Sequence, residues 1–177
     1  TINEVAKSSG RGFVAHSKSK EGMRRAILAG AETIEHGDFL DKEIATLMKE
    51  HKVTFFPTLS AVEMIAQYRG WQKGKQPEPA NITNKHKSFK EALNAGVIIG
   101  MGGDVGVYAH GQNALEMKLM VEYGMKPIDV LKAATSVNAK AFHLDQELGY
   151  LKPGYLIPIM YFKSYDNTSS NQNILAG

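Results

Sequence analysis

Short apolar segments, each closed by a polar residue, recur along most of this chain. Four of them predict β-strands, because they are short, rich in β-branched and aromatic residues, and bordered by glycine or turn residues. These segments are residues 12–15, 33–35, 53–56 and 97–101. His16, His36, Thr58 and Asp104 lie at or just beyond their carboxyl ends.

Helical patterns separate the predicted strands. Apolar side chains recur at helical spacing in residues 21–28, 42–48, 84–95, 113–123 and 129–142, and less clearly in residues 62–71. Asp41 is a candidate N-cap, and Gly30 stands where a helix C-terminal cap is expected. Residues 72–83, which contain two prolines, predict an irregular connection.

The alternation of strands and helices predicts an α/β fold with a parallel sheet. The predicted strands begin near residues 12, 33, 53 and 97, and the first two gaps fit single βα units. Four such units make either an open doubly wound sheet or half of a (βα)8 barrel. A complete barrel needs about 250 residues. The 177 residues of this chain therefore supply only one half, the second.

Composition excludes several functional classes. The net charge is +3, from 21 basic and 18 acidic residues that are scattered along the chain, so we expect no nucleic-acid partner. No apolar run is long enough to span a bilayer, so we expect no membrane partner. The absence of cysteine excludes a disulfide scaffold and a thiol nucleophile. No targeting segment is visible, and the cytoplasm is the default location.

Three polar residues that close predicted strands are candidates for chemistry. The carboxyl ends of parallel strands converge on one edge, so His16, His36 and Asp104 can meet there. Two imidazoles and a carboxylate are a ligand set that suits zinc or a similar divalent metal. The alternative is that these histidines are structural and hydrogen bonded. Glu35 precedes His36 directly, so we expect it to face the opposite side of its strand.

The ordered motifs resemble the amidohydrolase superfamily, in the imidazolonepropionase-like branch with Xaa-Pro dipeptidases and arginine carboxypeptidases. The motifs are Val-Ala-His at 14–16, Thr-Ile-Glu-His-Gly at 33–37, Gly-Asp-Val-Gly at 103–106, Ala-Ala-Thr-Ser at 133–136 and Leu-Gly-Tyr-Leu-Lys-Pro-Gly at 148–154. The resemblance implies that residues 1–156 form strands five to eight of the catalytic (βα)8 barrel. Residues 157–177 are then a divergent tail, which we expect to hold an edge strand followed by a poorly ordered end.

The resemblance also implies roles. It makes His16 and His36 ligands of one zinc ion and Asp104 a ligand of a second, which also carries a proton between the attacking water and the leaving amine. His110, Asn113 and Tyr108 would border the substrate, a small peptide or amide. The first barrel half is missing from this sequence, so we expect at most one weakly held metal and impaired activity of the chain alone. Gly103 stands where the family usually has threonine.

Two other functions remain open from the sequence. The chain can be a non-catalytic binding or assembly module that forms oligomers or needs a partner to supply the missing strands, because half a barrel exposes sheet edges. Alternatively, the glycine-rich residues 100–103 can bind phosphate through their backbone amides, as a phosphate-binding βα domain would.

Overall fold

The computed structural model describes residues 1–156 and places three parallel strands in the order β1-β2-β3. The strands are β1 (Val14–Ser17), β2 (Thr33–His36) and β3 (Thr54–Phe56), which confirms three of the four predicted strands. Their register aligns Ala15 with Ile34 and Ile34 with Phe55. The predicted edge strand in the tail lies outside the described residues.

The fourth predicted strand is reduced to a single bridge. Residues 97–101 run parallel to β3, but only Phe55 and Ile99 pair. The Phe55 amide donates to the Ile98 carbonyl at 2.8 Å, and the Gly100 amide donates to the Phe55 carbonyl at 2.9 Å. The predicted position beside β3 is therefore confirmed. The predicted full strand was wrong, because only one bridge forms there. Gly100 ends the pairing where its backbone approaches the Phe56 ring, since a Cβ at residue 100 would lie 2.5 Å from a ring carbon.

The helices follow most of the predicted patterns. The first half of the described chain holds α1 (Ile2–Ser8), α2 (Lys20–Leu28), α3 (Lys42–His51) and α4 (Leu59–Tyr68). The second half holds α5 (Ala80–Ala95), α6 (Ala114–Glu122), α7 (Pro127–Lys132) and α8 (Asn138–Ala141). The Asp41 carboxylate accepts from the Ile44 amide at 3.0 Å, so it caps α3 as predicted.

Three helical segments differ from the sequence prediction. No pattern predicted α1, and none of its residues is buried. Helix α5 begins directly after Pro79, so the last residues of the predicted irregular connection are helical. The stretch predicted as one helix over 129–142 contains a π-helical turn at Ala133–Val137 between α7 and α8. The Thr135 hydroxyl donates to the Leu131 carbonyl at 2.7 Å there, in the back-bonding that competes with regular helical bonds.

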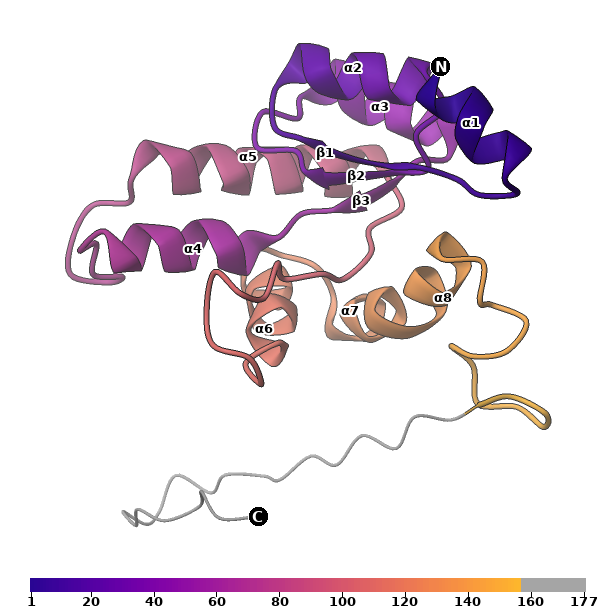
Figure 1. Cartoon of the computed structure of the whole chain (residues 1–177). Coiled ribbons are helices and arrows are strands. Elements are labelled where there is room, and N and C mark those ends of the chain that lie inside the picture. The colour runs from indigo at the N-terminus through magenta and orange to yellow at the C-terminus, as the bar shows by residue number, and fades with distance from the viewer. Residues whose placement is uncertain (157–177) are drawn as a thin grey trace.

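The core lies between the sheet and its outer helices. In Figure 1, α2 and α3 cover one face of the sheet, and α5 continues this layer. Ile34 and Phe55 point into it and are fully buried. They share a cluster with apolar side chains of these helices, which include Met23, Ile27, Ile44, Met48 and Phe89. Each such side chain contributes about 1.5–3 kcal/mol by leaving water.

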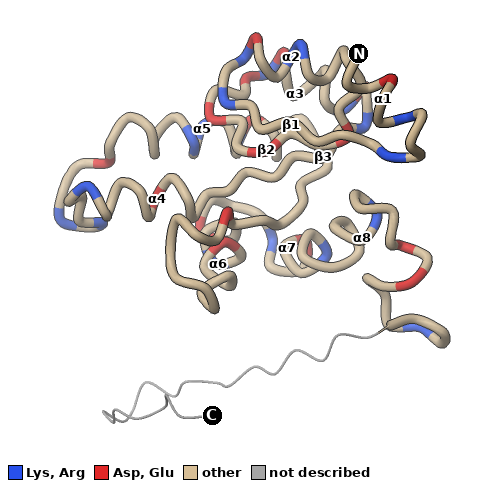
Figure 2. Tube along the Cα trace, in the orientation of Figure 1, with Lys and Arg blue, Asp and Glu red and all other residues tan. Residues whose placement is uncertain are grey.

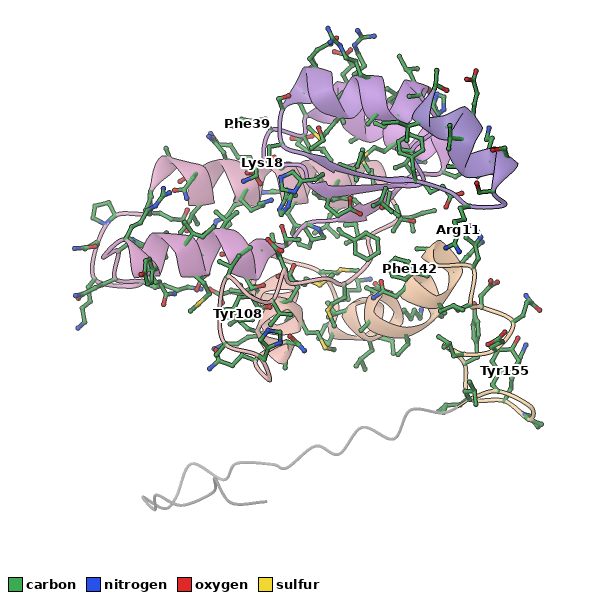
Figure 3. All side chains as sticks on the ribbon, viewed as in Figure 1. Arg11, Lys18, Phe39, Tyr108, Phe142 and Tyr155 are labelled. Atoms are coloured by element: carbon green, nitrogen blue, oxygen red, sulfur yellow. The ribbon has the colours of Figure 1, made fainter. Side chains whose placement is uncertain are left out.

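The other face of the sheet is the interior face of the barrel, and it is only partly covered. On β1, Val14 is 58% exposed and His16 is exposed as well. On β3, Phe56 is buried, and its ring lies 5.7 Å from that of Phe142 at the end of α8, which Figure 3 labels. Helices α6, α7 and α8 lie below the sheet in Figure 1. The result is a partial (βα)8 barrel whose interior is open along β1.

Charged residues of both signs are interspersed along the described elements (Figure 2). For example, Glu21 on α2 accepts from both Arg24 and Arg25. None of the helices within residues 1–156 is long and apolar enough to cross a bilayer.

Candidate metal and catalytic site

The structure brings His16 and His36 into direct contact at the carboxyl ends of β1 and β2. The Nδ1 atom of His16 lies 3.0 Å from the Nε2 atom of His36, and the ring centroids are 4.1 Å apart. Strand register alone would not produce this contact, because the residue that pairs with His16 is Glu35. His36 instead has a left-handed backbone with φ 73°, which turns its side chain back toward the interior face. Backbone strain of this kind costs about 1–3 kcal/mol and is often found at functional sites.

Glu35 shares the interior face with His16, because the two residues are in register. It accepts a hydrogen bond from the Thr33 hydroxyl, while its Oε2 atom is buried without a partner among the described residues. The expectation that Glu35 points away from the site was therefore wrong. Strict alternation places it opposite His36, but His36 is the residue that departs from the alternation.

The two facing ring nitrogens lie at hydrogen-bonding distance, and their spacing is also compatible with two ligands of one metal ion. Tetrahedral zinc with Zn–N bonds of about 2.0–2.1 Å separates two nitrogen ligands by roughly 3.3 Å. The observed 3.0 Å is close to that spacing. Burial, together with the nearby His16 and Lys85, lowers the pKa of His36 to about 4, although the Asp104 carboxylate acts in the opposite direction. His36 is thus neutral at physiological pH, the form in which imidazole binds metals.

Asp104 stands apart from a complete ligand set. It is exposed, with φ 58°, in the loop that follows residues 97–101. Within residues 1–156, no three His, Cys, Asp or Glu side chains gather closely enough to hold a metal ion. The structure therefore unites the two predicted histidine ligands and leaves the predicted carboxylate outside their pair.

Thr58 is the second partner of His36. Its hydroxyl oxygen lies 2.8 Å from His36 Nδ1, and both residues are buried. Thr58 also occupies the N-cap position of α4 with a left-handed φ of 48°, but its side chain forms no capping hydrogen bond. The hydroxyl that ordinarily caps a helix is thus used to hold the histidine.

Glu116 of α6 caps α4 in place of Thr58. Its Oε1 atom accepts from the Leu59 amide at 2.9 Å, and its Oε2 atom accepts from the Ser60 amide at 2.7 Å and the Ser60 hydroxyl at 2.6 Å. The carboxylate is completely buried, and burial raises its pKa, while these hydrogen bonds favour the ionised form. The positive end of the α4 dipole further stabilises a negative charge at this position.

Lys85 of α5 forms hydrogen bonds to the backbone at the ends of both β2 and β3. Its buried ammonium group donates to the His36 carbonyl at 2.6 Å and to the Pro57 carbonyl at 2.7 Å, and it forms an ion pair with Asp38. Burial lowers the pKa of Lys85, and the neighbouring Asp38 carboxylate opposes that shift. One side chain therefore fixes the backbone at His36 and at the residue that precedes Thr58.

Sequence reasoning missed Lys85 and Glu116, and it placed Thr58 at the end of a strand without giving it a role. The sequence did contain a signal for the two charged residues, Lys85 and Glu116. Lys85 interrupts an apolar stripe of α5 that includes Ile82 and Phe89. Glu116 lies on the buried side of α6 with Leu119 and Met120. A charge at such a position must find a buried partner.

The three predicted substrate contacts occupy different environments. His110 and Asn113 are exposed in the loop before α6, and Asn113 stands at the N-cap of that helix. Tyr108, labelled in Figure 3, is buried in the same loop, and its hydroxyl lies 3.2 Å from the Ser60 hydroxyl. A Cβ at Gly103 would lie 2.1 Å from the Tyr108 hydroxyl. The absence of a side chain at Gly103 therefore makes room for Tyr108.

Two backbone amides of the glycine-rich residues 100–103 are already hydrogen bonded within the chain. The Met101 amide donates to the Asn138 side chain at 3.0 Å, and the Asn138 amide group donates back to the Met101 carbonyl at 2.7 Å. The Gly100 amide is used in the bridge to Phe55. These two amides are therefore not available for a phosphate cradle, which needs converging unpaired amides.

Two other histidines, His86 and His143, contact side chains away from the strand ends. The His143 Nε2 atom lies 2.9 Å from Glu32, and the His86 Nδ1 atom lies 3.3 Å from Glu78. The His86 ring also packs edge-on against Tyr123 with centroids 3.7 Å apart.

Fold and strand-end histidines together define a barrel protein of the amidohydrolase type. The chain belongs to the Amidohydrolase family, whose profile matches residues 1–176. It is 34% identical over 139 residues to ochratoxinase of Aspergillus niger, across 76% of this chain and 28% of that enzyme. It is also similar to the structure of a Xaa-Pro dipeptidase with bound methionine in the active site, with 35% identity and a TM-score of 0.77.

The solved structures, like the curated relative, are matched over only part of their length. The match to the dipeptidase covers 86% of this chain and 39% of that chain. The match to the ochratoxinase structure has 32% identity and a TM-score of 0.75, and it covers 87% of this chain and 36% of that chain. The chain thus spans about two fifths or less of these relatives, as expected for part of a barrel.

Proposed function

We propose that this chain carries part of the active site of a zinc-dependent hydrolase that cleaves amide or peptide bonds, in the manner of a dipeptidase or carboxypeptidase. The observation that carries the proposal is the contact of 3.0 Å between His16 Nδ1 and His36 Nε2 at the carboxyl ends of adjacent strands. Barrel enzymes build their active sites at this end. His16 and His36 would hold the metal.

A bound divalent metal would polarise the substrate carbonyl and lower the pKa of a water molecule. Asp104, exposed at the same end of the barrel, would accept the proton of the attacking water and return it to the leaving nitrogen. Water and amide are thereby converted to acid and amine, with no net change in Asp104. His110 and Asn113 are exposed beside it and would contact the substrate, whereas Tyr108 would support that loop from beneath.

The similar proteins support a substrate of this size and class. One is a Xaa-Pro dipeptidase that holds methionine in its active site. A peptide or amide with an amino-acid group is therefore the substrate class we favour for this chain. Because the chain spans 39% of that dipeptidase, we expect weak metal binding and impaired activity until the other part of the barrel is present.

Metal content tests the proposal directly. The full chain, purified in the presence of zinc, is compared with His36→Ala, Asp104→Asn and the control His51→Ala, which alters an exposed histidine on α3. We expect bound zinc in the wild type and the control, loss in His36→Ala and a smaller decrease in Asp104→Asn. Equal zinc in all four proteins would reject the site.

An assembly module is the second candidate function, and one observation favours it. Strand β1 is the edge of the described sheet, and its interior face exposes Val14 and His16. A polypeptide that presents parallel strands could pair with this edge and complete the barrel. This function needs no catalysis by the chain, and it can also coexist with the hydrolase function.

A further inference from the structure

The contact between Thr58 and His36 links the tautomer of the imidazole to which of the two groups donates the hydrogen bond. The hydroxyl lies 2.8 Å from Nδ1, and the opposite nitrogen, Nε2, faces His16 at 3.0 Å. If Nδ1 holds the hydrogen and donates it to Thr58, Nε2 keeps a lone pair. If Thr58 donates instead, Nε2 must hold the hydrogen and is blocked as a ligand.

The surroundings of Thr58 keep its oxygen available as an acceptor. At the N-cap of α4, the hydroxyl oxygen would ordinarily accept from a backbone amide of the first turn. Glu116 has taken that role, since its two carboxylate oxygens accept from the Leu59 and Ser60 amides. The oxygen of Thr58 is therefore free to accept from His36.

Lys85 holds the backbone on both sides of this hydrogen bond and so helps to set the distance between His36 and Thr58. Its ammonium group binds the carbonyl of His36 and the carbonyl of Pro57, directly before Thr58. Both residues have left-handed backbones, with φ 73° at His36 and 48° at Thr58, so neither orientation follows from the strand itself. Lys85 and Glu116 hold two strained residues against each other.

We propose that Thr58 is a positioning residue whose hydroxyl accepts the Nδ1 hydrogen of His36, holding the imidazole in the tautomer that presents Nε2 as a metal ligand. Histidine ligands commonly donate their second ring N–H to a neighbouring acceptor, which fixes ring orientation and basicity. The part of the inference that concerns metal rests on the proposed function. The part that concerns the tautomer rests on the geometry alone.

Ring 15N NMR of the metal-free full chain at neutral pH tests the tautomer. The His36 signals are identified by their loss in His36→Gln. We expect the Nδ1–H form in the wild type and in Thr58→Ser, which keeps the hydroxyl. In Thr58→Val, which keeps the branched shape, we expect the Nε2–H form to become dominant. Thr46→Val is the control, because its hydroxyl bonds only within α3.

Zinc affinity, measured by competition with a chromogenic chelator, is the second measurement. We expect Thr58→Val to bind zinc about 10- to 100-fold more weakly than the wild type, and Thr58→Ser to restore most of the affinity. Circular dichroism shows whether each variant is folded, and the wild-type tautomer is informative even if Thr58→Val does not fold.

The two measurements separate the possible failures. An Nε2–H tautomer in the wild type, or an unchanged tautomer in folded Thr58→Val, would overturn the inference. A loss of zinc affinity without a tautomer change would do the same, since it would reflect a structural effect only. If the tautomer follows the Thr58 hydroxyl while no protein binds zinc, the positioning role of Thr58 stands and the proposed function fails.

Discussion

At the scale of single residues, the site depends on positions where the sequence departs from simple rules. His36 leaves the alternation of its strand through a left-handed backbone, and this brings its ring to His16. Gly103 and Tyr108 depend on each other in a similar way. The Tyr108 hydroxyl occupies the space that any side chain at residue 103 would enter. The absence of a side chain at one position and the burial of a ring at the other are therefore one structural feature.

A double-mutant cycle tests this dependence. Gly103→Thr alone should destabilise the chain by about 1–3 kcal/mol, because it forces Tyr108 out of its place. Combined with Tyr108→Ala, it should cost less than the sum of the two single variants, by roughly 1–2 kcal/mol of coupling. Urea denaturation provides the free energies of unfolding. Gly102→Thr is the control, since a Cβ there would lie 3.3 Å from the Phe56 ring and would not meet Tyr108.

Additive effects of Gly103→Thr and Tyr108→Ala would show that the two residues do not share this space. A coupling of similar size with Gly102→Thr would point instead to a general loosening of the loop.

At the scale of elements, α4 begins without a cap of its own and depends on α6. Its N-cap hydroxyl serves His36, and the carboxylate of Glu116 satisfies the first backbone amides. A buried carboxylate is costly to desolvate, so it is retained where several donors converge on it. The orientation of α4 and the position of Thr58 are consequently linked to the packing of a helix more than 50 residues further along the chain.

Removal of the Glu116 carboxylate tests whether α4 depends on α6 for its N-terminal cap. Glu116→Ala leaves two buried amides without an acceptor, and we expect a loss of about 3 kcal/mol in the free energy of unfolding. Glu116→Gln retains one acceptor oxygen and should lose about 1 kcal/mol. Glu122→Ala, on the same helix, removes an ion pair with Lys73 at the surface and should change stability by less than about 1 kcal/mol. Chemical denaturation measures all three. Equal stability of Glu116→Ala and the wild type would contradict the capping role.

At the scale of the whole molecule, the described residues form a barrel sector with an exposed edge. Outer helices bury one face of the sheet, whereas Val14 on β1 is 58% exposed on the other. An uncovered edge strand with apolar side chains readily pairs with another chain. The open interior therefore favours association, either with copies of this chain or with a polypeptide that supplies parallel strands.

We expect light scattering of the isolated chain to show concentration-dependent association that Val14→Lys reduces. A charge on an edge strand opposes strand pairing. Ile128→Lys on α7 is the control, because Ile128 is 57% exposed but lies away from the β1 edge. A wild-type chain that stays monomeric at every concentration would argue against the need for a partner. Equal reduction by both variants would assign the association to general surface hydrophobicity.

The sequence by itself determined the α/β class, the places of the strands and most of the helices, because these depend on local periodicity and caps. It also placed His16 and His36 at the carboxyl ends of adjacent strands, which is a consequence of strand direction and spacing. Only the tertiary structure decided the left-handed turn at His36, which a chain adopts when packing compensates the strain. It alone paired Lys85 with carbonyls 49 and 28 residues away and Glu116 with amides of α4. The partner of a buried charge is chosen by the three-dimensional packing, and the local pattern shows only that a partner must exist.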